Sequence, residues 1–432
     1  MSEKKQIYKP RPISGFPEWL PEIRAVEQTW LDKIRAVYER YGYCSIETPA
    51  VEELEVIAAK GEDVDKEIYV LERLQADPDE KKDARLALHF DQTVPLARYV
   101  AQNFNDLTFP FKRYQMQKVW RGERPQVGRM REFYQCDIDV INVDHLPLHF
   151  DAEVAAVCYE ALASLGIGRV QLRISNRKIL GGLIQGLELE NLTEITRIID
   201  KYEKIGKNET VNLMQLQDIT NGQIQSLMDF VQTKNIQDLS ASNALMEEGI
   251  EELSFVLDQL AHLPEGAVVA DLSIVRGLDY YTGTVYETQL FGDDNEPLFT
   301  GSVCSGGRYD DLAGNYINKH LPGVGISIGF TRLFDVLRQS GKITPGPKSP
   351  AKVLVVLPEE DQRAAMNEVA RTLRENGINT ETAHGGKLKK QIAYAEKKGI
   401  PYIWFPADAQ VKDMATGEQT DADPNDWKPA DA

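Results

Sequence analysis

The segment 276–283 carries the most concentrated set of side chains that could do chemistry. It places Arg276 and the adjacent tyrosines Tyr280 and Tyr281 between glycines, directly after the apolar run 267–274. A strand that ends in this way would hold a guanidinium and two phenols at the rim of a pocket. The guanidinium is a planar, permanent cation suited to phosphate or carboxylate, and a phenol can donate to or accept from a polar ring. Taken alone, the segment is better explained as a surface ion pair beside core tyrosines. The other motifs of the chain must therefore decide between this explanation and a binding pocket.

A second concentration of charge lies between two strand-like segments. Residues 121–131 are rich in arginine, and Phe133 follows them. These arginines would repel one another unless an anion bound between them or carboxylates offset them. Because arginine binds phosphate oxygens in pairs, a triphosphate is a natural ligand. A solvated turn balanced by Glu123 and Glu132 is an equally weighted alternative. The arginines of this loop are Arg121, Arg124, Arg129 and Arg131.

The strand after this loop has polar side chains at alternate positions. Gln135, Asp137 and Asp139 would therefore lie on one face. An amide and two carboxylates in a row beneath an arginine loop would suit a cationic, polar small molecule. The alternative is the exposed face of an edge strand, where alternating polar residues are common.

Two shorter patterns could complete a site. Asp91 and Thr93 follow a short apolar strand and could share one ammonium group, although Thr93 could equally cap a helix that begins near Pro95. The paired glycines Gly306 and Gly307 would let a ligand approach the backbone. A tight turn is the alternative for that pair.

A third glycine pattern ends at an arginine. The spacing of Gly323, Gly325 and Gly329 does not match a dinucleotide-binding fingerprint. It better fits a strand that packs closely against something flat and leads to Arg332 at the start of a helix.

Composition limits the class of protein. The chain has 432 residues, 42% of them hydrophobic and 27% charged, which predicts a globular protein of two or three domains. A net charge of -18 argues against indiscriminate polyanion binding but allows a local basic groove. The four cysteines are far apart, which fits a reducing compartment. No leader-like or membrane-spanning apolar run is present, so we expect a cytoplasmic protein without a membrane partner.

The elements that must position these residues can be read from periodicity. Residues 17–41 predict a long amphipathic helix. Residues 111–120 and 132–141 predict two long strands, joined as an antiparallel hairpin by the arginine loop. Leu-, Ile- and Glu-rich stretches from about 176 to 262 predict a helical insertion, and strand patterning returns at Val268.

The C-terminal part has a different pattern. We expect a catalytic core over residues 1–338, a Pro-, Gly- and Ser-rich linker over 339–350, and a separate domain over 351–432. Strands and helices alternate in the last segment, which predicts an α/β domain with a largely parallel sheet. The polar, acidic tail from Thr420 is expected to fray.

Taken together, these segments resemble the histidyl-tRNA synthetase family of class II aminoacyl-tRNA synthetases. The helix up to Pro49 resembles class II motif 1, a dimer-interface element. Residues 121–139 resemble motif 2, and 325–333 (GISIGFTRL) resemble motif 3. The segments RGLDYYTG and SGGRYDDL are similar to two that are peculiar to the histidine enzymes, and the last domain resembles their anticodon-binding domain. The implied fold is an α+β core built on an antiparallel sheet, with a helical insertion and a C-terminal α/β domain.

The resemblance implies an activity and two sets of site residues. The enzyme would activate L-histidine with ATP and Mg²⁺, forming histidyl-adenylate, and transfer it to the 3′ end of histidine tRNA. Arg121 would hold the α-phosphate and the reacting carboxylate, with Arg276 across from it, and these two would be catalytic. The implied ATP-binding residues are Arg121, Glu123, Arg129, Phe133 and Arg332. The implied histidine-binding residues are Asp91, Thr93, Gln135, Asp139, Arg276, Tyr280, Tyr281, Tyr309, Gly306 and Gly307.

Finer roles are also implied by the resemblance. Glu123 would reach the adenine edge, and Arg332 would take the γ-phosphate. Asp139 and Tyr281 would bind the two imidazole nitrogens. The α-amino group would be received by Asp91, Thr93 and Gln135, and the pocket would be closed by Tyr309, Gly306 and Gly307. The protein alone supplies no metal site in this scheme, because Mg²⁺ arrives with ATP.

The chain departs from the family pattern at several positions. His89 stands where many relatives have arginine, and Gln92 where they often have leucine or glycine. Asp91 and Asp139 are glutamate in some branches, so each carboxylate has less reach here. The last domain is short after Phe405, a departure that bears on anticodon binding more than on adenylation.

Partners and alternatives follow from the same resemblance. We expect a homodimer that binds tRNA, with Lys387, Lys389 and Lys390 positioning phosphates; a merely solvated helix face is equally compatible with these lysines. A non-catalytic relative, serving as a histidine-binding regulatory subunit of ATP phosphoribosyltransferase or as a tRNA sensor, is the runner-up. The intact RGLDYYTG segment and the C-terminal domain disfavour it. A class II synthetase for another amino acid is disfavoured by the paired tyrosines with Asp139.

Overall fold

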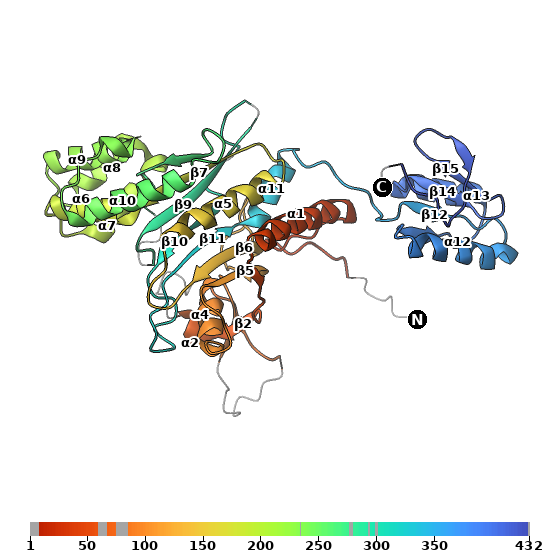
Figure 1. Cartoon of the computed structure of the whole chain (residues 1–432), viewed down its shortest axis with the longest axis horizontal. Helices are drawn as coiled ribbons and strands as arrows, with labels where there is room; N and C mark the ends of the chain where they lie inside the picture. Colours follow the sequence, from red (N-terminus) through yellow and green to blue (C-terminus); the bar gives the residue numbers. More distant parts are fainter. Residues whose placement is uncertain are drawn as a thin grey trace, which may run out of the picture. The chain divides into compact units, whose positions relative to one another are not determined.

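The computed structural model describes residues 8–58, 67–74, 85–233, 235–275, 280–292, 294–298 and 301–430 (Figure 1). The chain divides into two compact units. One contains the residues up to Pro17 together with Trp30–Lys342, and the other contains Glu18–Thr29 together with the chain from Ile343 onward. None of the helices described is both long enough and apolar enough to cross a membrane.

The first unit is built on an eight-stranded sheet with the order β1–β5–β6–β11–β10–β9–β7–β8. The six central strands pair antiparallel, whereas β1 with β5 and β7 with β8 pair parallel. The expected antiparallel core is therefore confirmed, with parallel edge pairs that the sequence did not indicate. The strands are β1 (Cys44–Ser45), β5 (Phe111–Trp120), β6 (Glu132–Ile141), β7 (Arg169–Asn176), β8 (Val268–Ala270), β9 (Thr284–Phe291), β10 (Cys304–Tyr309) and β11 (Gly323–Ile328).

The hairpin of β5 and β6 has the bounds that alternation predicted. It is in register from Phe111 opposite Ile141 to Trp120 opposite Glu132. One face of β6 carries the fully buried Cys136, Ile138 and Val140, which belong to the core. The other face carries the polar residues 135, 137 and 139, so the sheet has one core face and one polar face.

Helices cover the core face of the sheet. Helices α5 (His149–Ala163) and α11 (Phe330–Gln339) pack against β6 and β11. Helix α1 (Pro21–Arg40) reaches the same core through Trp30, whose ring packs edge-on against Phe334 at 5.3 Å between centroids. The helix begins four residues later than the predicted 17–41, because Pro17 and Pro21 bracket its start. Large aromatic contacts of this kind stabilise the layer on which the site is built.

A small three-stranded sheet in the order β2–β4–β3 accompanies the hairpin. Its elements and their helices are β2 (Val51–Glu53), α2 (Leu54–Ala58), β3 (Val70–Leu71), β4 (Leu86–Leu88) and α4 (Thr93–Gln102). Helix α4 begins at Thr93, two residues before the predicted start near Pro95. Thr93 is not its cap: the carboxylate Oδ1 of Asp91 accepts the backbone N–H of Val94 at 3.1 Å. The side chain that closes this helix end is therefore the one expected to receive an ammonium group.

The predicted helical insertion is confirmed. Figure 1 shows helices α6–α10 gathered as a bundle beside β7 and β9. Its elements are α6 (Arg177–Gly186), α7 (Leu192–Asp200), α8 (Tyr202–Gln215), α9 (Asn221–Gln232), η1 (Ile236–Asp238) and α10 (Ala244–Gln259). Helices α6 and α10 approach closely because Gly182 and Gly249 face the partner helix. A Cβ at Gly182 would lie 2.5 Å from the backbone nitrogen of Met246.

The second unit contains a five-stranded sheet in the order β13–β12–β14–β15–β16. Strands β13, β12 and β14 are parallel, whereas β15 and β16 are antiparallel. The prediction of a largely parallel sheet is thus correct only for the first three strands. The elements are β12 (Val353–Val355), η2 (Glu360–Gln362), α12 (Arg363–Glu375), β13 (Thr380–Thr382), α13 (Leu388–Lys398), β14 (Tyr402–Phe405), β15 (Gln410–Asp413) and β16 (Gln419–Asp421).

The C-terminal tail does not fray from Thr420 as predicted. Strand β16 pairs with β15, and Trp427 packs edge-on against the rings of Tyr402 at 5.2 Å and Trp404 at 5.5 Å. An indole that covers a core tryptophan offsets the entropy of ordering a polar tail. Trp427 was the overlooked signal in an otherwise acidic segment.

Candidate active site

A polar cavity of about 240 Å³ lies where the arginine loop meets the start of α11. Arg121 enters it from the end of β5, Arg129 from the loop, and Arg332 from the first turn of α11. The structure thus brings Arg332 beside two arginines of the loop 121–131, from which it is remote in sequence. The cavity is lined by Arg121, Glu123, Gly128, Arg129, Met130, Phe133, Gln135, Ser302, Val303, Ser305, Ser327, Gly329 and Arg332.

Arg121 is held by a carbonyl and an aromatic ring. Its Nε donates to the carbonyl of Phe90 at 3.0 Å, and its guanidinium lies over the ring of Phe133, 5.2 Å from the centroid. The carbonyl and the ring orient the guanidinium, and the carboxylate of Glu67 also interacts with its charge. Arg121 is therefore oriented as a cation on the cavity wall.

The loop is only partly balanced by its own acids. Glu123 forms an ion pair with Arg129, and its carbonyl accepts from Nε of Arg131 at 3.1 Å. Glu132 instead accepts from Lys118 at 2.6 Å and Trp120 at 3.0 Å. Of the two acids in the solvated-turn alternative, one is thus engaged outside the loop. This arrangement favours an anion as the ligand of the loop arginines other than Arg129.

A second, smaller cavity of about 30 Å³ adjoins the first. Ser305 of β10 and Ser327 of β11 line both cavities. The two spaces therefore share one wall, one lined by arginines and the other by carboxylates and phenols. The lining of the smaller cavity is Thr93, Asp137, Asp139, Tyr280, Tyr281, Ser305, Tyr309, Gly325, Ile326 and Ser327.

Asp139 is the most constrained carboxylate of the smaller cavity. Its Oδ2 lies 2.5 Å from Nη2 of Arg113, and its Oδ1 accepts the hydroxyl of Tyr309 at 3.0 Å. Burial raises the pKa of Asp139, and the charge of Arg113 opposes that rise. Arg113 has no exposed surface and was not predicted as a site residue. The hairpin register, which sets Arg113 directly opposite Asp139, was the signal that could have found it.

Glycines make room for these side chains. A Cβ on Gly325 would lie 2.0 Å from Oδ1 of Asp139, and one on Gly307 would lie 2.7 Å from the ring of Tyr281. A Cβ on Gly306 would meet the carbonyl of Gly325 at 2.1 Å. Gly306 and Gly307 therefore lie behind the cavity wall and permit the close approach of strands and rings, as Gly325 does for the carboxylate.

Asp137 and Gln135 supply acceptors on the same face. Burial raises the pKa of Asp137 to about 7, although Arg113 and Ser327 pull it down. The amide Nε2 of Gln135 donates to the hydroxyl of Ser327 at 2.7 Å. Its buried Oε1 meets no hydrogen-bond partner among the described residues. An acceptor of this kind suits a cationic ligand.

Two of the residues that depart from the family pattern, Gln92 and His89, hydrogen-bond to the hairpin. The Nε2 of Gln92 donates to the carbonyls of Gln117 at 3.0 Å and Gln135 at 3.1 Å. The Nε2 of His89 lies 2.8 Å from the carbonyl of Lys118, and burial lowers the pKa of the imidazole. Both side chains therefore join the start of α4 to the strands that carry the site.

Aromatic rings close the smaller cavity. The ring of Tyr280 stacks on Tyr309 at 5.2 Å and meets Tyr281 edge-on at 5.1 Å between centroids. Burial raises the pKa of all three phenols, so they remain neutral donors at pH 7. Arg276, the other predicted residue of this segment, lies outside the described residues.

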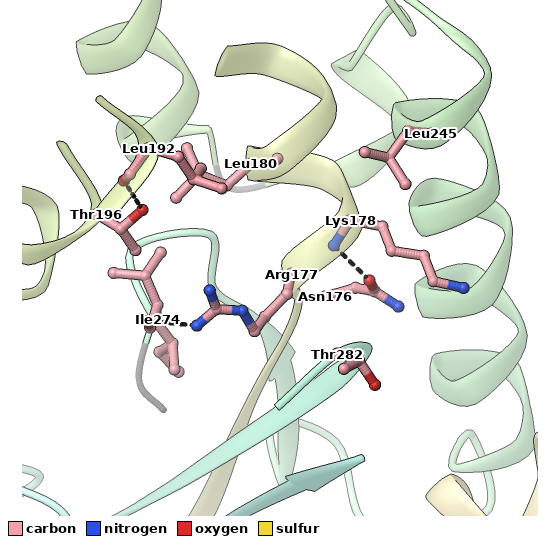
Figure 2. A pocket seen from close by; sticks show the side chains of 11 residues that line it. Asn176, Arg177, Lys178, Leu180, Leu192, Thr196, Leu245, Ile274 and Thr282 are labelled. Atoms are coloured by element: carbon pink, nitrogen blue, oxygen red, sulfur yellow. Dashed lines mark hydrogen bonds between the residues drawn. The ribbon is translucent and has the colours of Figure 1, made fainter. Parts of the chain in front are cut away.

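A third cavity, of about 230 Å³, lies between the helical insertion and the segments on either side of residues 276–279 (Figure 2). Its apolar wall comes from α6, α7 and α10 of the insertion, and from Ile274 and Val275. The guanidinium of Arg177 points into this space, and its Nη1 donates to the carbonyl of Val275 at 3.4 Å. Local sequence patterns do not indicate this cavity, because its walls come from five separate segments.

The lysines predicted for tRNA lie in the second unit, at the start of α13. Lys387 is the residue before the helix, Lys389 and Lys390 are in its first turn, and all three are exposed. The first unit holds the remaining predicted residues. No group of three or more His, Cys, Asp or Glu side chains in the described part of the chain could hold a metal ion.

Comparison with known proteins matches the sequence of this chain to a family. The profile of histidyl-tRNA synthetase matches residues 15–333, and that of an anticodon-binding domain matches residues 352–424. A histidine–tRNA ligase of Thermobifida fusca is 53% identical and covers 99% of this chain and 100% of the relative. One of Micrococcus luteus is 46% identical and covers 96% of each.

Solved structures agree. The crystal structure of histidyl-tRNA synthetase from Nostoc sp. PCC 7120 has a TM-score of 0.85 at 39% identity, covering 96% of this chain and 97% of that one. A structure from Bacillus halodurans, described as an ATP phosphoribosyltransferase regulatory subunit/histidyl-tRNA synthetase, has a TM-score of 0.73. It is 21% identical, covers 90% of this chain and 97% of that one, and shows the fold alone.

Proposed function

The chain belongs to the histidyl-tRNA synthetase family, and we propose from this premise how its two adjoining cavities divide the work of a histidine–tRNA ligase. Close relatives that match over the full length are histidine–tRNA ligases, which supports the catalytic interpretation over a regulatory subunit. The reaction joins the histidine carboxylate to the α-phosphate of ATP and then transfers the histidyl group to tRNA. The observation that carries the division is the wall of Ser305 and Ser327 shared by the two cavities.

In this proposal the larger cavity binds ATP. Arg121 at the end of β5 faces the α-phosphate, and Arg332 on α11 takes the γ-phosphate, which keeps the triphosphate bent. Phe133 stacks on the adenine. At the adenine edge, Glu123 accepts a hydrogen bond and Arg129 donates one. Because the arginines come from a hairpin and a helix packed on one sheet, their spacing is fixed before ATP arrives.

Mg²⁺ enters this site with the triphosphate. In the described residues no protein cage of carboxylates or imidazoles is present, so phosphate oxygens and water would supply the ligands. The ion would neutralise part of the phosphate charge. The arginines would then orient the phosphate oxygens that the ion does not bind.

The smaller cavity binds histidine. Asp139, which Arg113 and Tyr309 hold in place, binds one ring nitrogen. Tyr281 binds the other. The α-amino group is received by Asp91, Thr93 and the acceptor oxygen of Gln135. Gly306 and Gly307 allow the strands and rings behind the cavity wall to pack closely. A side chain without two ring nitrogens would leave these buried groups unpaired, which costs far more than a missing methylene. The carboxylate of histidine then points to the shared wall.

Chemistry at the shared wall needs no covalent enzyme intermediate. The carboxylate attacks the α-phosphate and pyrophosphate leaves, so the protein contributes position and fixed positive charge. Arg121 supplies that charge from one side, and Arg276 is assigned to the other. Replacement of Arg276 by alanine should lower adenylation by several orders of magnitude while histidine still binds.

The second unit binds tRNA, and the chain works as a homodimer in the cytoplasm. Lys387, Lys389 and Lys390 would position phosphates at the start of α13. The dimer is supported by exposed apolar side chains in the three-stranded sheet, where Leu71 lies opposite Leu86. Sedimentation of the purified chain as a monomer would contradict the dimer.

Histidine-dependent exchange of pyrophosphate into ATP tests the whole assignment. The purified protein should support exchange with histidine and with no other amino acid of a full panel, and omission of Mg²⁺ should abolish it. Arg276→Ala should bind histidine by calorimetry yet fail in exchange. Histidine binding without any exchange by the native protein would favour the regulatory or sensor alternative.

A further inference from the structure

His89 is a buried imidazole that lines neither cavity of the active site. It has no exposed surface, and it lies in the segment between β4 and α4. Its Nε2 lies 2.8 Å from the carbonyl of Lys118 on β5. A carbonyl can only accept a hydrogen bond, so Nε2 carries the hydrogen and donates it. Burial lowers the pKa of the ring, which is therefore neutral at pH 7.

The other ring nitrogen of His89 has a different environment. Its Nδ1 is buried and meets no hydrogen-bond partner among the residues that the structure describes. The ring lies beside the indole of Trp120, with 5.5 Å between the centroids. The imidazole is therefore held at one nitrogen and along one face, and a donor at the place of Nε2 is needed to reproduce its bond to β5.

The backbone of His89 is joined to the same strand. Its carbonyl accepts the N–H of Trp120 at 3.1 Å, and its own N–H donates to the carbonyl of Ala50 at 3.1 Å. Strand β1 pairs with β5 at Arg113 and Tyr114, six residues or more before this end of the strand. The segment 89–90 thus takes the place of a neighbouring strand where β5 ends, and it satisfies backbone groups at that edge.

This series of contacts ends at the guanidinium of Arg121. Arg121 follows directly after β5, and its Nε donates at 3.0 Å to the carbonyl of Phe90, the residue after His89. The segment 89–90 therefore meets the chain at residues 118, 120 and 121 in succession. Because the donors of a guanidinium form a rigid planar fork, a shift of the accepting carbonyl changes the direction in which the other donors point.

The imidazole bond is better suited to fixing geometry than to adding stability. A neutral hydrogen bond contributes little net stability, because the unfolded chain makes the same bonds with water. The rate of a reaction is far more sensitive to position, since a displacement of about 1 Å at a reacting group can cost on the order of 10²-fold. We therefore expect the main consequence of losing this bond in the rate of histidine activation.

We propose that His89 is a positioning residue for histidine activation: its bond to Lys118 fixes the segment 89–90 on the end of β5, and the carbonyl of Phe90 then orients Arg121. This inference rests on the proposed role of Arg121 at the α-phosphate. Because His89 lies outside the cavity assigned to histidine, its loss should lower kcat and leave the KM for histidine unchanged.

The decisive experiment compares His89→Gln with His89→Asn in histidine-dependent pyrophosphate exchange, with kcat expressed per mole of folded protein. The amide nitrogen in His89→Gln can occupy the place of Nε2, whereas the amide nitrogen in His89→Asn falls at the place of Nδ1. His89→Gln should therefore retain most of the native kcat. His89→Asn should lower kcat by roughly 10²-fold, with the KM for histidine within about twofold of the native value.

His89→Phe provides a second test that keeps a ring beside Trp120 and removes both ring nitrogens. It should lower kcat as His89→Asn does, because neither variant can donate to Lys118. Two variants of different polarity that share this one loss separate the missing hydrogen bond from a general defect in packing.

A double-mutant cycle with Arg121→Lys tests whether the effect passes through Arg121. Arg121→Lys keeps a positive charge but lacks the planar fork, so this variant should be slow yet measurable. If His89 acts by orienting the guanidinium, adding His89→Asn to Arg121→Lys should slow the exchange no further.

His320→Phe is the matched control. A ring nitrogen of His320 lies 3.1 Å from the carbonyl of Asp144, and the carbonyl of His320 accepts the N–H of Asp144 at 2.9 Å. The same kind of contact thus occurs beyond Ile141, at the end of β6 that is remote from Arg121. His320→Phe should exchange at the native rate.

The outcomes separate the positioning role from the proposed function. Native kcat in His89→Asn and His89→Phe beside a slow Arg121→Lys would overturn the positioning role and leave the proposed function intact. Equal losses in His89→Gln and His89→Asn, or losses that multiply in the double variant, would overturn it as well. So would a raised KM for histidine at native kcat, which would place the effect at the histidine cavity. A native rate for Arg121→Lys would instead remove the catalytic assignment on which the inference rests.

Discussion

At the scale of single residues, the site depends on how each carboxylate is paired. Burial raises the pKa of both Asp139 and Asp137, the latter to about 7, but Asp139 is held directly by a guanidinium and a phenol. Two aspartates two positions apart on one strand thus have different environments. Asp139 is fixed as an acceptor by its two partners, whereas Asp137 is partly protonated near pH 7.

Asp137 should make the stability of the unliganded protein depend on pH. Its pKa is about 7 in the folded chain and near 3.8 when unfolded, so between these values the folded state holds a proton that the unfolded state has released. The free energy of unfolding should therefore fall as pH rises from about 4 to 7, by roughly 4 kcal/mol at most. Urea unfolding across this range should show a flatter profile for Asp137→Asn.

The control for this experiment is Asp32→Asn on helix α1, whose side chain is 48% exposed. It should reproduce the native profile. A native slope in Asp137→Asn would mean that this carboxyl is ionised in the folded protein throughout the range.

At the scale of elements, the hairpin of β5 and β6 does most of the positioning. Its register sets Arg113 opposite Asp139, its end presents Arg121, and its polar face presents Gln135. Strand β11 completes the face because Gly325 leaves room for the carboxylate of Asp139. The shared wall of Ser305 and Ser327 then exists only because β10 pairs with β11 in register.

Arg113→Met should break the pair across this hairpin. It leaves the buried carboxylate of Asp139 without its cation, so we expect a loss of about 3–5 kcal/mol in the free energy of unfolding. Histidine binding, measured by calorimetry, should weaken because Asp139 becomes protonated. The double variant Arg113→Met/Asp139→Leu should recover stability but not histidine binding.

The comparison for Arg113 is Arg371→Met, which removes one partner of an exposed ion pair on α12. Solvent screens that pair, so urea unfolding should be nearly unchanged. Equal losses in both variants would show that the buried pair has no special role in the hairpin.

At the scale of the whole molecule, different functions belong to the two units, and charged residues are unevenly distributed. The chain carries a net charge of -18, yet three exposed lysines lie together at the start of α13. An acidic body disfavours indiscriminate nucleic-acid binding, so we expect tRNA to bind at local basic positions. Ordering of the tail by Trp427 gives the short second unit a complete core.

Charge reversal of Lys389 and Lys390 to glutamate should weaken tRNA binding and leave pyrophosphate exchange unchanged. Phosphate contacts contribute to affinity through counterion release, so the dependence of affinity on salt should also become shallower. Filter binding at several salt concentrations measures both effects. Reversal of Lys412 and Lys428 in the same unit matches the change in net charge, and an equal loss there would reduce the effect to bulk electrostatics.

The hairpin bounds, the helical insertion, the arginine loop and the family could be predicted from the amino-acid sequence, because alternation, helical period and motif spacing are local properties of the chain. The sequence also identified the carboxylates and tyrosines that line the smaller cavity. The tertiary structure was needed to show that Tyr309 holds Asp139 and that Ser305 and Ser327 form the shared wall. These contacts join strands that are remote in sequence, such as β6 and β10, and local periodicity carries no information about which distant strand becomes a neighbour.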